Sequence, residues 1–316
     1  LKKNYIEGFK IRLTEARNNF FPKAIKFIYS CNIFSDYLFK YWTADQVNNG
    51  AKIIYGQHGA NYHAFLHDVR HEHELNISDI YLSWGWRGKS DKIKPCCMFL
   101  ASNKNVHAKK QNNKILFLPG IIIHPVEPVL LRTFNKNIFN ALSKSDELTN
   151  FFDGLKKESL NKIYVKPHPA ERKIKLKEIL KKYKELKFLD KKLNPFKIAK
   201  DYALILFSNL DSTAFYQFIS LNKPCVVIVD NCSEILKEEY KKEWKDMLDA
   251  KVFHETSDSL IKFIDENKDI LSWWDSPTTK KAVTAFRLNN CKYENDISSN
   301  LCKEIKNFKL LTIKNE

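Results

Sequence analysis

A short polar stretch, Ser208–Thr213, follows an apolar segment and precedes one with helical spacing of apolar residues. Ser212 and Thr213 open that helix, and Asp211 stands directly before them. The N-terminus of a helix carries unpaired N–H groups and the positive end of the helix dipole, so it can bind a phosphate. Asp211 or Ser212 could equally serve only to cap the helix. The residues alone support both interpretations.

A histidine between two prolines follows a second apolar segment, in the order Lys166-Pro167-His168-Pro169. The flanking prolines restrict the backbone, and an imidazole changes its charge near neutral pH. His168 could therefore protonate a departing phosphate or donate a hydrogen bond to it. The dipeptide His-Pro is common by chance, and its position at the end of a predicted strand is what gives it weight.

A third polar segment, Gln57-His58-Gly59, follows the predicted strand Lys52–Tyr55. Glycine allows the backbone to approach a ligand closely, while Gln57 and His58 offer polar side chains there. The segment lacks the Gly-Lys-Ser/Thr of a phosphate-binding P-loop and is not a Gly-x-Gly-x-x-Gly turn. A tight turn before a capped helix is the structural alternative.

Histidines are concentrated in one short region, because five of the nine lie between His58 and His73. The spacing of His63, His67 and His71 would align them on a helix, as zinc ligands sometimes are. However, the region contains no His-Glu-x-x-His motif, and the chain contains no Asp-x-Asp with which to hold a metal against a sugar diphosphate. We therefore expect no metal and no cofactor.

Three carboxylates near these segments could deprotonate an acceptor hydroxyl or attack a sugar carbon: Asp36, Glu72 and Glu74. Asp36 stands near a predicted helix start, where it could simply complement the helix dipole. Spacing does not choose among the three.

The elements that would position these residues alternate between strands and helices. A helix is predicted from Ser35 and Asp36 to Gly50, and another over Leu176–Leu186. The predicted strands are Lys52–Tyr55, Ile115–Leu118, Ile163–Val165, Ala203–Phe207, Cys225–Val229 and Lys251–His254. Runs that are apolar throughout suit parallel strands covered on both faces, which predicts a doubly wound α/β fold. The loops after such strands meet at one edge of the sheet, where ligands bind.

The bulk composition is that of a soluble globular protein, with 44% hydrophobic and 28% charged residues. The net charge of +16 suits nucleic acid, an anionic membrane face or anionic sugar nucleotides, or it reflects a lysine-rich proteome. No stretch reaches the roughly 20 apolar residues of a membrane span. Seven scattered cysteines predict thiols in a reducing cytoplasm. The first residue is Leu1, which suggests that an N-terminal portion is missing.

Several segments resemble a family of transferases from bacterial O-antigen and surface-polysaccharide loci. They are Tyr55–Tyr62, His73–Asp79, Ser83–Trp86, Asn222–Pro224 and Trp273–Pro277. The resemblance extends from about Tyr5 to Cys291. It implies a GT-B fold, with two Rossmann-like lobes facing a cleft and an N-terminal lobe that is incomplete here.

The same family is distantly similar to bacterial sialyltransferases and capsular Kdo transferases, whose His-Pro and Ser/Thr motifs hold the phosphate of CMP. The matching residues are His168, Pro169, Ser212 and Thr213. This resemblance implies a CMP-activated ulosonic acid as donor. Gln217 departs from the pattern, because a glutamate that touches the donor ribose commonly stands at its position.

The sequence thus predicts a metal-independent glycosyltransferase with a nucleotide-sugar donor and a glycan or lipid-linked glycan acceptor. It would be cytoplasmic, with peripheral contact to the inner membrane face as a compatible addition, and would bind no nucleic acid. The predicted catalytic residues are Asp36, His58, Glu72 and His168; the predicted donor-binding residues are Gln57, Gly59, Lys166, Pro169, Asp211, Ser212 and Thr213. The predicted division is an N-terminal lobe over residues 1–110, a nucleotide-sugar lobe over 111–276 and a helical tail over 277–316.

Three alternatives remain at this point. A nucleotide-sugar epimerase shares the two-lobed architecture, and it would convert the sugar nucleotide without an acceptor. A basic nucleic-acid-binding protein would explain the charge, although the lysines are dispersed and no helix-turn-helix or zinc-finger pattern is present. A non-catalytic scaffold of a polysaccharide assembly would bind no sugar nucleotide.

Overall fold

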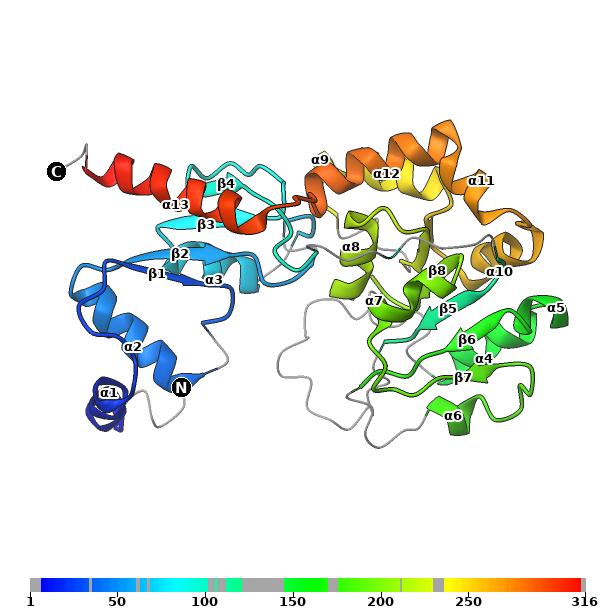
Figure 1. The fold of residues 1–316 in the computed structure, drawn as a ribbon, viewed down its shortest axis with the longest axis horizontal. Helices are drawn as coiled ribbons and strands as arrows, with labels where there is room; N and C mark the ends of the chain where they lie inside the picture. Colours follow the sequence, from blue (N-terminus) through cyan, green and yellow to red (C-terminus); the bar gives the residue numbers. More distant parts are fainter. Residues whose placement is uncertain are drawn as a thin grey trace. The chain divides into compact units, whose positions relative to one another are not determined.

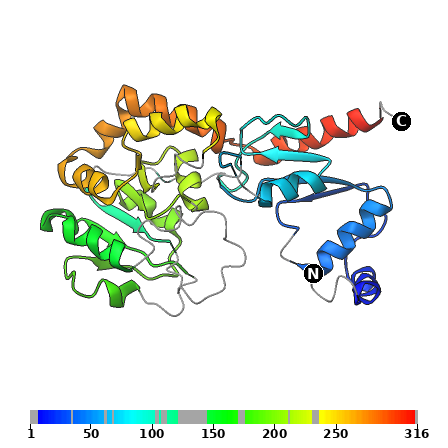
Figure 2. The same ribbon diagram turned by 180° about the vertical axis from the view of Figure 1, so that it is seen from behind.

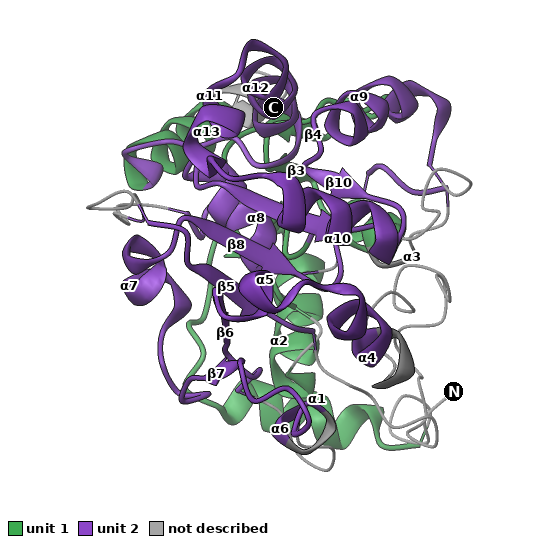
Figure 3. Ribbon diagram, turned by 90° about the vertical axis from the view of Figure 1, so that its right-hand side faces the viewer, with its two compact units in different colours: residues 1–59, 69–97, 298–316 green, residues 60–68, 98–297 purple. Residues whose placement is uncertain are grey.

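The computed structural model describes residues 7–33, 36–60, 63–66, 69–101, 106, 112–120, 145–169, 176–210, 212–229 and 236–313 (Figure 1). The chain divides into two units, coloured separately in Figure 3. Unit 1 contains residues 1–59, 69–97 and 298–316, and unit 2 contains residues 60–68 and 98–297. Each unit contains a parallel β-sheet with helices, so the predicted α/β class is confirmed.

The described sheet of unit 2 has six parallel strands in the order β10-β9-β8-β5-β6-β7. They are β5 (Ile115–Leu118), β6 (Ile163–Val165), β7 (Lys187–Phe188), β8 (Leu204–Phe207), β9 (Cys225–Ile228) and β10 (Phe253–His254). After β5 the chain adds β6 and β7 on one side of the sheet, and after β8 it adds β9 and β10 on the other side. This is the strand order of Rossmann-type dinucleotide-binding sheets.

Helices cover both faces of this sheet; Figure 2 shows the same elements from behind. One face packs against α4 (Ser145–Gly154), α5 (Lys157–Leu160), α6 (Leu176–Ile179), α10 (Ser257–Glu266) and α11 (Ile270–Asp275). The other packs against α7 (Pro195–Ile198), α8 (Thr213–Ser220), α9 (Glu238–Asp249) and α12 (Pro277–Asn290). A 3₁₀ turn, Ala199–Asp201, precedes β8.

Alternate residues of β8 show how the two layers are held. Leu204 and Leu206 belong to the apolar core on the first face. The ring of Phe207 points to the second face, where its centroid lies 5.5 Å from that of Phe215 and 6.1 Å from that of Phe218 on α8. All four residues of β8 are buried, as expected for a strand covered on both sides. Unit 2 therefore has the doubly wound arrangement that the sequence predicted.

Unit 1 contains four described parallel strands that follow one another in chain order. They are β1 (Phe27–Ser30), β2 (Lys52–Gly56), β3 (Ile80–Ser83) and β4 (Ile93–Pro95). The helices of this unit are α1 (Phe9–Asn18), α2 (Tyr37–Asn48), α3 (Val69–Ile77) and α13 (Ile297–Ile313). α2 and α3 are the crossover connections from β1 to β2 and from β2 to β3, which brings the starts of both helices to the carboxyl edge of the sheet.

The first predicted helix is confirmed as α2. The side chain of Asp36 accepts a hydrogen bond from the amide of Phe39 at 2.9 Å and thereby caps the helix start. Tyr41 and Trp42 of α2 are buried against Ala16 of α1. Gly50 follows the helix with φ +96°, a backbone conformation that favours glycine.

The predicted helix over Leu176–Leu186 is wrong beyond its first turn, because only Leu176–Ile179 is helical. The chain then turns into β7, where Lys187 pairs with Tyr164 of β6. The hydroxyl of Tyr183 donates to the backbone carbonyl of Thr149 and to Asp153, both at 2.8 Å. Leu176, Leu180, Tyr183 and Leu186, whose spacing suggested a helix, are buried in the core all the same. Strands β1, β3, β4 and β7 were not predicted.

The two units are interleaved along the chain in a way that differs from the predicted division. Most of unit 2 is the continuous segment Met98–Ile297. The unit also includes residues 60–68, which lie between β2 and α3 in the chain. In that segment Phe65 forms a bridge with Leu236, and the carbonyl of His63 accepts a hydrogen bond from the ammonium group of Lys237 at 2.8 Å. Most of the predicted linker Ser102–Asn113 lies outside the described residues.

Among the described residues, no helix combines the length and the apolar character that crossing a membrane requires. The described cysteines are all thiols, as the sequence predicted. Cys232 lies outside the described residues.

A buried histidine at the end of β10 makes the stability of unit 2 dependent on pH. His254 is fully buried, with Nδ1 2.9 Å from the hydroxyl of Ser259 and Nε2 3.0 Å from the carbonyl of Lys251. Because a carbonyl only accepts, Nε2 carries the proton of the neutral ring. Burial lowers the pKa of His254 to about 4.

We predict that His254 makes the protein less stable as the pH falls from 6.5 toward 4. In this range the histidine of the unfolded chain takes up a proton while the buried ring does not, so the free energy of unfolding drops by about 2–3 kcal/mol. Urea denaturation at pH 7.5 and pH 4.5 should show a smaller pH effect in His254→Gln than in the wild type. An equal pH effect in both proteins would contradict the assignment.

Candidate active site

The switch point of the unit 2 sheet lies between the adjacent parallel strands β5 and β8. The strands that follow β5 in the chain are added on one side of this pair, and those that follow β8 are added on the other side. Doubly wound sheets bind ligands outside the carboxyl ends of the strands at such a point. The loop at residues 119–120 follows β5, and the loop at residues 208–212 follows β8. The fold therefore places the stretch that begins at Ser208, which the sequence singled out, beside the loop that follows β5.

These two loops are in direct contact. The amide of Gly120 donates a hydrogen bond to the hydroxyl of Ser208 at 2.7 Å. A Cβ atom at Gly120 would lie 2.1 Å from the side-chain nitrogen of Asn209, so only glycine fits without displacing that side chain. Ser208 and Asn209 are both buried. Gly120, Ser208 and Asn209 were not predicted as site residues from the sequence; a glycine two residues after a predicted strand, in a chain with only eight glycines, was the available signal.

The start of α8 is open. Ser212 is the N-cap residue with an extended backbone, but within the described residues its side chain forms no capping hydrogen bond. Its carbonyl accepts the amide of Phe215 at 2.9 Å. Ser212 and Thr213 are both half-buried. Asp211, the other predicted cap, lies outside the described residues. Ser212 therefore does not cap the helix through its side chain, and its contact with a donor remains a prediction.

The His168 loop ends at the same edge of the sheet. It follows β6, which pairs with β5 on the side opposite β8. Neighbouring strands are about 4.8 Å apart, so the strands that precede His168 and Ser212 are separated by about 10 Å. His168 and Pro169 are exposed. The predicted convergence of these distant segments at one sheet edge is confirmed by the topology.

Lys166 has a different environment from the one expected of a ligand-binding lysine. Its side chain is 3% exposed, and the ammonium group donates to the carbonyls of Pro167 at 3.3 Å and Lys191 at 3.1 Å. Burial lowers the pKa of Lys166. The ammonium group therefore ties the loop after β6 to the loop after β7, and its contact with a donor remains a prediction.

In unit 1, Gln57 joins the ends of two neighbouring strands. Its Oε1 accepts the backbone amide of Trp84 at 2.9 Å and the indole N–H of Trp86 at 2.8 Å. Its Nε2 donates to the carbonyl of Gly59 at 2.7 Å. The residue is 2% exposed. The Gln-His-Gly and Trp-Gly-Trp segments, which are far apart in the sequence, are therefore one hydrogen-bonded structure.

This structure presents His58 to solvent. Gln57 is held inside, Gly59 is half-buried, and the side chain of His58 between them is exposed at the carboxyl end of β2. Asp36 lies at the same edge, since it caps the helix that follows β1. The two residues predicted to face an acceptor therefore share one edge of the unit 1 sheet.

The remaining carboxylates lie on α3 and face different ways. Glu72 is exposed, whereas Glu74 is 1% exposed and accepts a hydrogen bond from the hydroxyl of Tyr81 at 3.2 Å. The ring of His71 packs edge-on against Tyr81, with centroids 5.3 Å apart. Glu74 thus belongs to the interior of unit 1, and Glu72 is the α3 carboxylate that solvent reaches.

The proposed alignment of three histidines on one helix is wrong. α3 begins at Val69, so His63 lies outside it, in a turn that belongs to unit 2. There its ring packs edge-on against Tyr240, with centroids 4.8 Å apart. His67 lies outside the described residues. Within the part of the chain that is described, no three His, Cys, Asp or Glu side chains are grouped as metal ligands.

Two further family-like segments have structural roles in unit 2. Asn222 adopts a left-handed backbone with φ +57° directly after α8, and the buried ammonium of Lys223 donates to the carbonyl of Tyr202. The indole of Trp273 donates to the carbonyl of Ala250 at 2.9 Å. Ser276 caps α12 through the amide of Thr279. The contacts of these residues position helices and strands of unit 2.

Gln217 on α8 is also engaged within unit 2. It is 9% exposed, and its Nε2 donates to the carbonyl of Leu100 at 3.1 Å. This hydrogen bond links α8 to Leu100, which lies close to Met98, where this part of unit 2 starts.

Unit 2 is thus an α/β unit of the Rossmann type. The chain belongs to a family of transferases, because the model of the LIC12162 family transferase matches residues 1–305. No curated protein sequence matches the chain.

Solved structures with a related arrangement are distant. The chain aligns with TarM at a TM-score of 0.46 and 10% identity, covering 89% of this chain and 53% of TarM. The wall teichoic acid polymerase TagF gives a TM-score of 0.41 and 12% identity over 97% of this chain and 86% of TagF. WaaG, a glycosyltransferase involved in lipopolysaccharide biosynthesis, gives a TM-score of 0.40 and 9% identity over 89% of this chain and 95% of WaaG. The chain thus spans about half the length of TarM. These likenesses are too distant to assign an activity.

We predict that Gln57→Leu destabilises unit 1 by about 2–4 kcal/mol, because it leaves two buried donors of Trp84 and Trp86 without their acceptor. The exposed neighbour provides a matched control, since His58→Ala should change stability by less than about 0.5 kcal/mol. Urea denaturation followed by tryptophan fluorescence measures both. Equal midpoints for the two variants would show that the Gln57 hydrogen bonds do not hold this edge together.

Proposed function

We propose that this protein is a glycosyltransferase that moves a sugar from a nucleotide-activated donor to a glycan acceptor. The observation that carries the proposal is the convergence of the Gly120, His168 and Ser212 loops at the switch point of a Rossmann-type sheet. Membership of a transferase family supports group transfer as the reaction class.

The donor phosphate would bind at the start of α8. The hydroxyl groups of Ser212 and Thr213 and the first amides of the helix provide hydrogen-bond donors, and the helix dipole favours an anion there. When the bond from the sugar to the phosphate breaks, negative charge develops on the phosphate oxygens. Donors that are already in place stabilise this charge without reorganisation. His168, on the neighbouring loop, would donate a hydrogen bond or a proton to the departing phosphate.

The donor would be a CMP-activated ulosonic acid. This choice is supported by the resemblance of the His168-Pro169 and Ser212-Thr213 motifs to those of CMP-dependent transferases. The family glutamate that touches ribose is replaced by Gln217, whose amide is engaged with Leu100. Recognition of the ribose would therefore depend on other groups at the sheet edge.

The acceptor would be held by unit 1. Asp36 and His58 share the carboxyl edge of that sheet, and Glu72 is the exposed carboxylate of α3. One of the two carboxylates would take the proton of the attacking hydroxyl. The acceptor would be a glycan or a lipid-linked glycan of a surface polysaccharide such as O-antigen, which would place the reaction in the cytoplasm at the inner membrane face.

We predict that CMP raises the melting temperature of the protein more than CDP, UDP or GDP do. A ligand at 100 times its dissociation constant stabilises the folded state by about 2.7 kcal/mol, which corresponds to a rise of several degrees. His168→Ala and Ser212→Ala should each weaken nucleotide binding at least about tenfold, because each removes a hydrogen bond to a charged group. A thermal-shift titration measures these effects.

The control variants for this titration are His73→Ala and Ser272→Ala, which change an exposed histidine on α3 and an exposed serine on α11. Both should respond to nucleotide as the wild type does. Absence of any nucleotide response in the wild type, or an equal loss in the control variants, would contradict the donor site.

We predict that transfer proceeds at an unchanged rate in the presence of EDTA. The chain contains no Asp-x-Asp motif to hold a divalent ion against a sugar diphosphate. In the proposed site the charge of the leaving group is instead balanced by amides, hydroxyl groups and His168. An initial-rate assay with EDTA, followed by readdition of Mg²⁺ or Mn²⁺, checks this. Loss of activity with EDTA that either metal restores would refute metal independence.

A further inference from the structure

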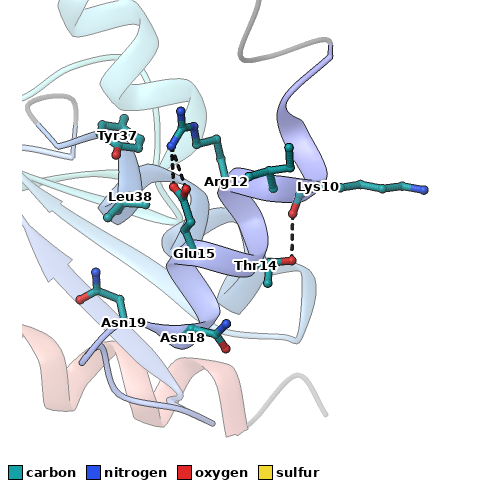
Figure 4. Close-up of a pocket in the computed structure, with 9 residues that line it drawn as sticks. Lys10, Arg12, Thr14, Glu15, Asn18, Asn19, Tyr37 and Leu38 are labelled. Atoms are coloured by element: carbon teal, nitrogen blue, oxygen red, sulfur yellow. Dashed lines mark hydrogen bonds and ion pairs between the residues drawn. The ribbon is translucent and has the colours of Figure 1, made fainter.

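A depression of about 760 Å³ lies in unit 1 between α1 and the first turn of α2 (Figure 4). We call it the α1–α2 pocket; its walls include Arg12, Glu15, Asn18, Asn19, Tyr37 and Leu38. Its volume is within the roughly 300–1,000 Å³ that is typical of ligand sites. Tyr37 directly follows Asp36, the N-cap residue of α2.

The walls of the pocket are fixed by the packing of the two helices. The guanidinium group of Arg17 contacts both carboxylate oxygens of Asp45, at 2.6 Å and 3.1 Å, and this contact lowers the pKa of Asp45. Ala16 is fully buried against Tyr41 and Trp42 of α2. The pocket residues of α1 are therefore held in a set position relative to Tyr37.

The lining combines an aromatic surface with hydrogen-bonding groups of both kinds. Tyr37 is 50% exposed, and the guanidinium carbon of Arg12 lies 5.5 Å from its ring centroid. Arg12 also contacts both oxygens of Glu15, at 2.7 Å and 2.9 Å (Figure 4). Among the described residues the side chain of Asn18 has no hydrogen-bond partner, and Asn19 uses only its oxygen, which accepts the amide of Phe20.

We infer that the α1–α2 pocket is a carbohydrate-binding subsite for the acceptor glycan, an assignment that rests on the proposed transferase function. A sugar presents hydroxyl groups that both donate and accept, and a C–H face that packs on an aromatic ring. Glu15 accepts, Arg12 donates, and the nitrogen of Asn19 is available to donate, while Tyr37 supplies the ring. An acceptor seated there contacts the residue that directly follows Asp36.

Other ligand classes fit this pocket less well. A phosphate group would face the carboxylate of Glu15, and Arg12 is already neutralised by it. The ammonium group of Lys10 extends away from Tyr37 (Figure 4). An acyl chain would require a continuous apolar lining, but Ile11, Tyr37 and Leu38 share the pocket with the charged or polar side chains of Lys10, Arg12, Thr14, Glu15, Asn18 and Asn19. The balance of charges suits a neutral or weakly acidic sugar.

The test uses saturation-transfer NMR on the full chain, with the methyl glycosides of glucose, galactose, N-acetylglucosamine and rhamnose at millimolar concentration. At least one glycoside should bind the wild type, and Tyr37→Leu should weaken that binding at least about fivefold. Asn18→Ala should weaken it as well. Phe20→Leu is the matched control, because Phe20 is 91% exposed and lies outside the pocket, and it should bind as the wild type does.

The pocket assignment fails if no glycoside binds the wild type, or if Tyr37→Leu and Phe20→Leu bind equally well. It also fails if inorganic phosphate displaces the bound glycoside. Thermal shifts with CMP on the same variants separate this failure from that of the proposed function. Tyr37→Leu should show the same thermal shift with CMP as the wild type, because Tyr37 belongs to unit 1. If CMP causes no thermal shift in the wild type, that result counts against the donor site alone.

Discussion

The parallel pairing of β5 with β8 is the constraint on which the candidate donor site depends. Its register places Leu118 beside Phe207, so the two strands end together and their loops begin side by side. The hydrogen bond from Gly120 to Ser208 then joins the loops, in a space where a larger residue would displace Asn209. Because β6 pairs with the other side of β5, the loop that carries His168 is added to the same edge. Three segments that are far apart in the chain are thereby brought to one place.

The central strands of unit 2 could be predicted from the sequence because they are buried on both faces. Runs such as Leu204–Phe207 and Cys225–Ile228 are apolar throughout, which is typical of central parallel strands. β7 could not be recognised in this way, because it has two residues, begins with an exposed lysine and lies at the edge of the sheet. The apolar residues before it repeat at helical intervals, yet a single helical turn followed by a loop buries them equally well. Burial alone therefore did not distinguish a helix from a turn.

The loops of the site followed from the predicted strands, but the contacts of individual side chains did not. Lys166 is buried because the loop after β7 covers it, and β7 was not predicted. Gln57 reaches Trp84 and Trp86 because β2 pairs with β3, which was not predicted either. Both residues stood out in the sequence, and both turn out to hold loops together. A distinctive motif can thus mark the scaffold that presents a neighbouring residue, as Gln57 does for His58.

The central claim is that a nucleotide binds against the start of α8, beside the Gly120–Ser208 contact. Hydrogen–deuterium exchange with and without CMP tests it directly, because a phosphate that accepts hydrogen bonds from the first amides of α8 slows their exchange. The account predicts protection in peptides that span 117–120 and 208–216, with little change in α9 or α10. Protection confined to other segments of the chain, at a CMP concentration that saturates binding, would contradict it.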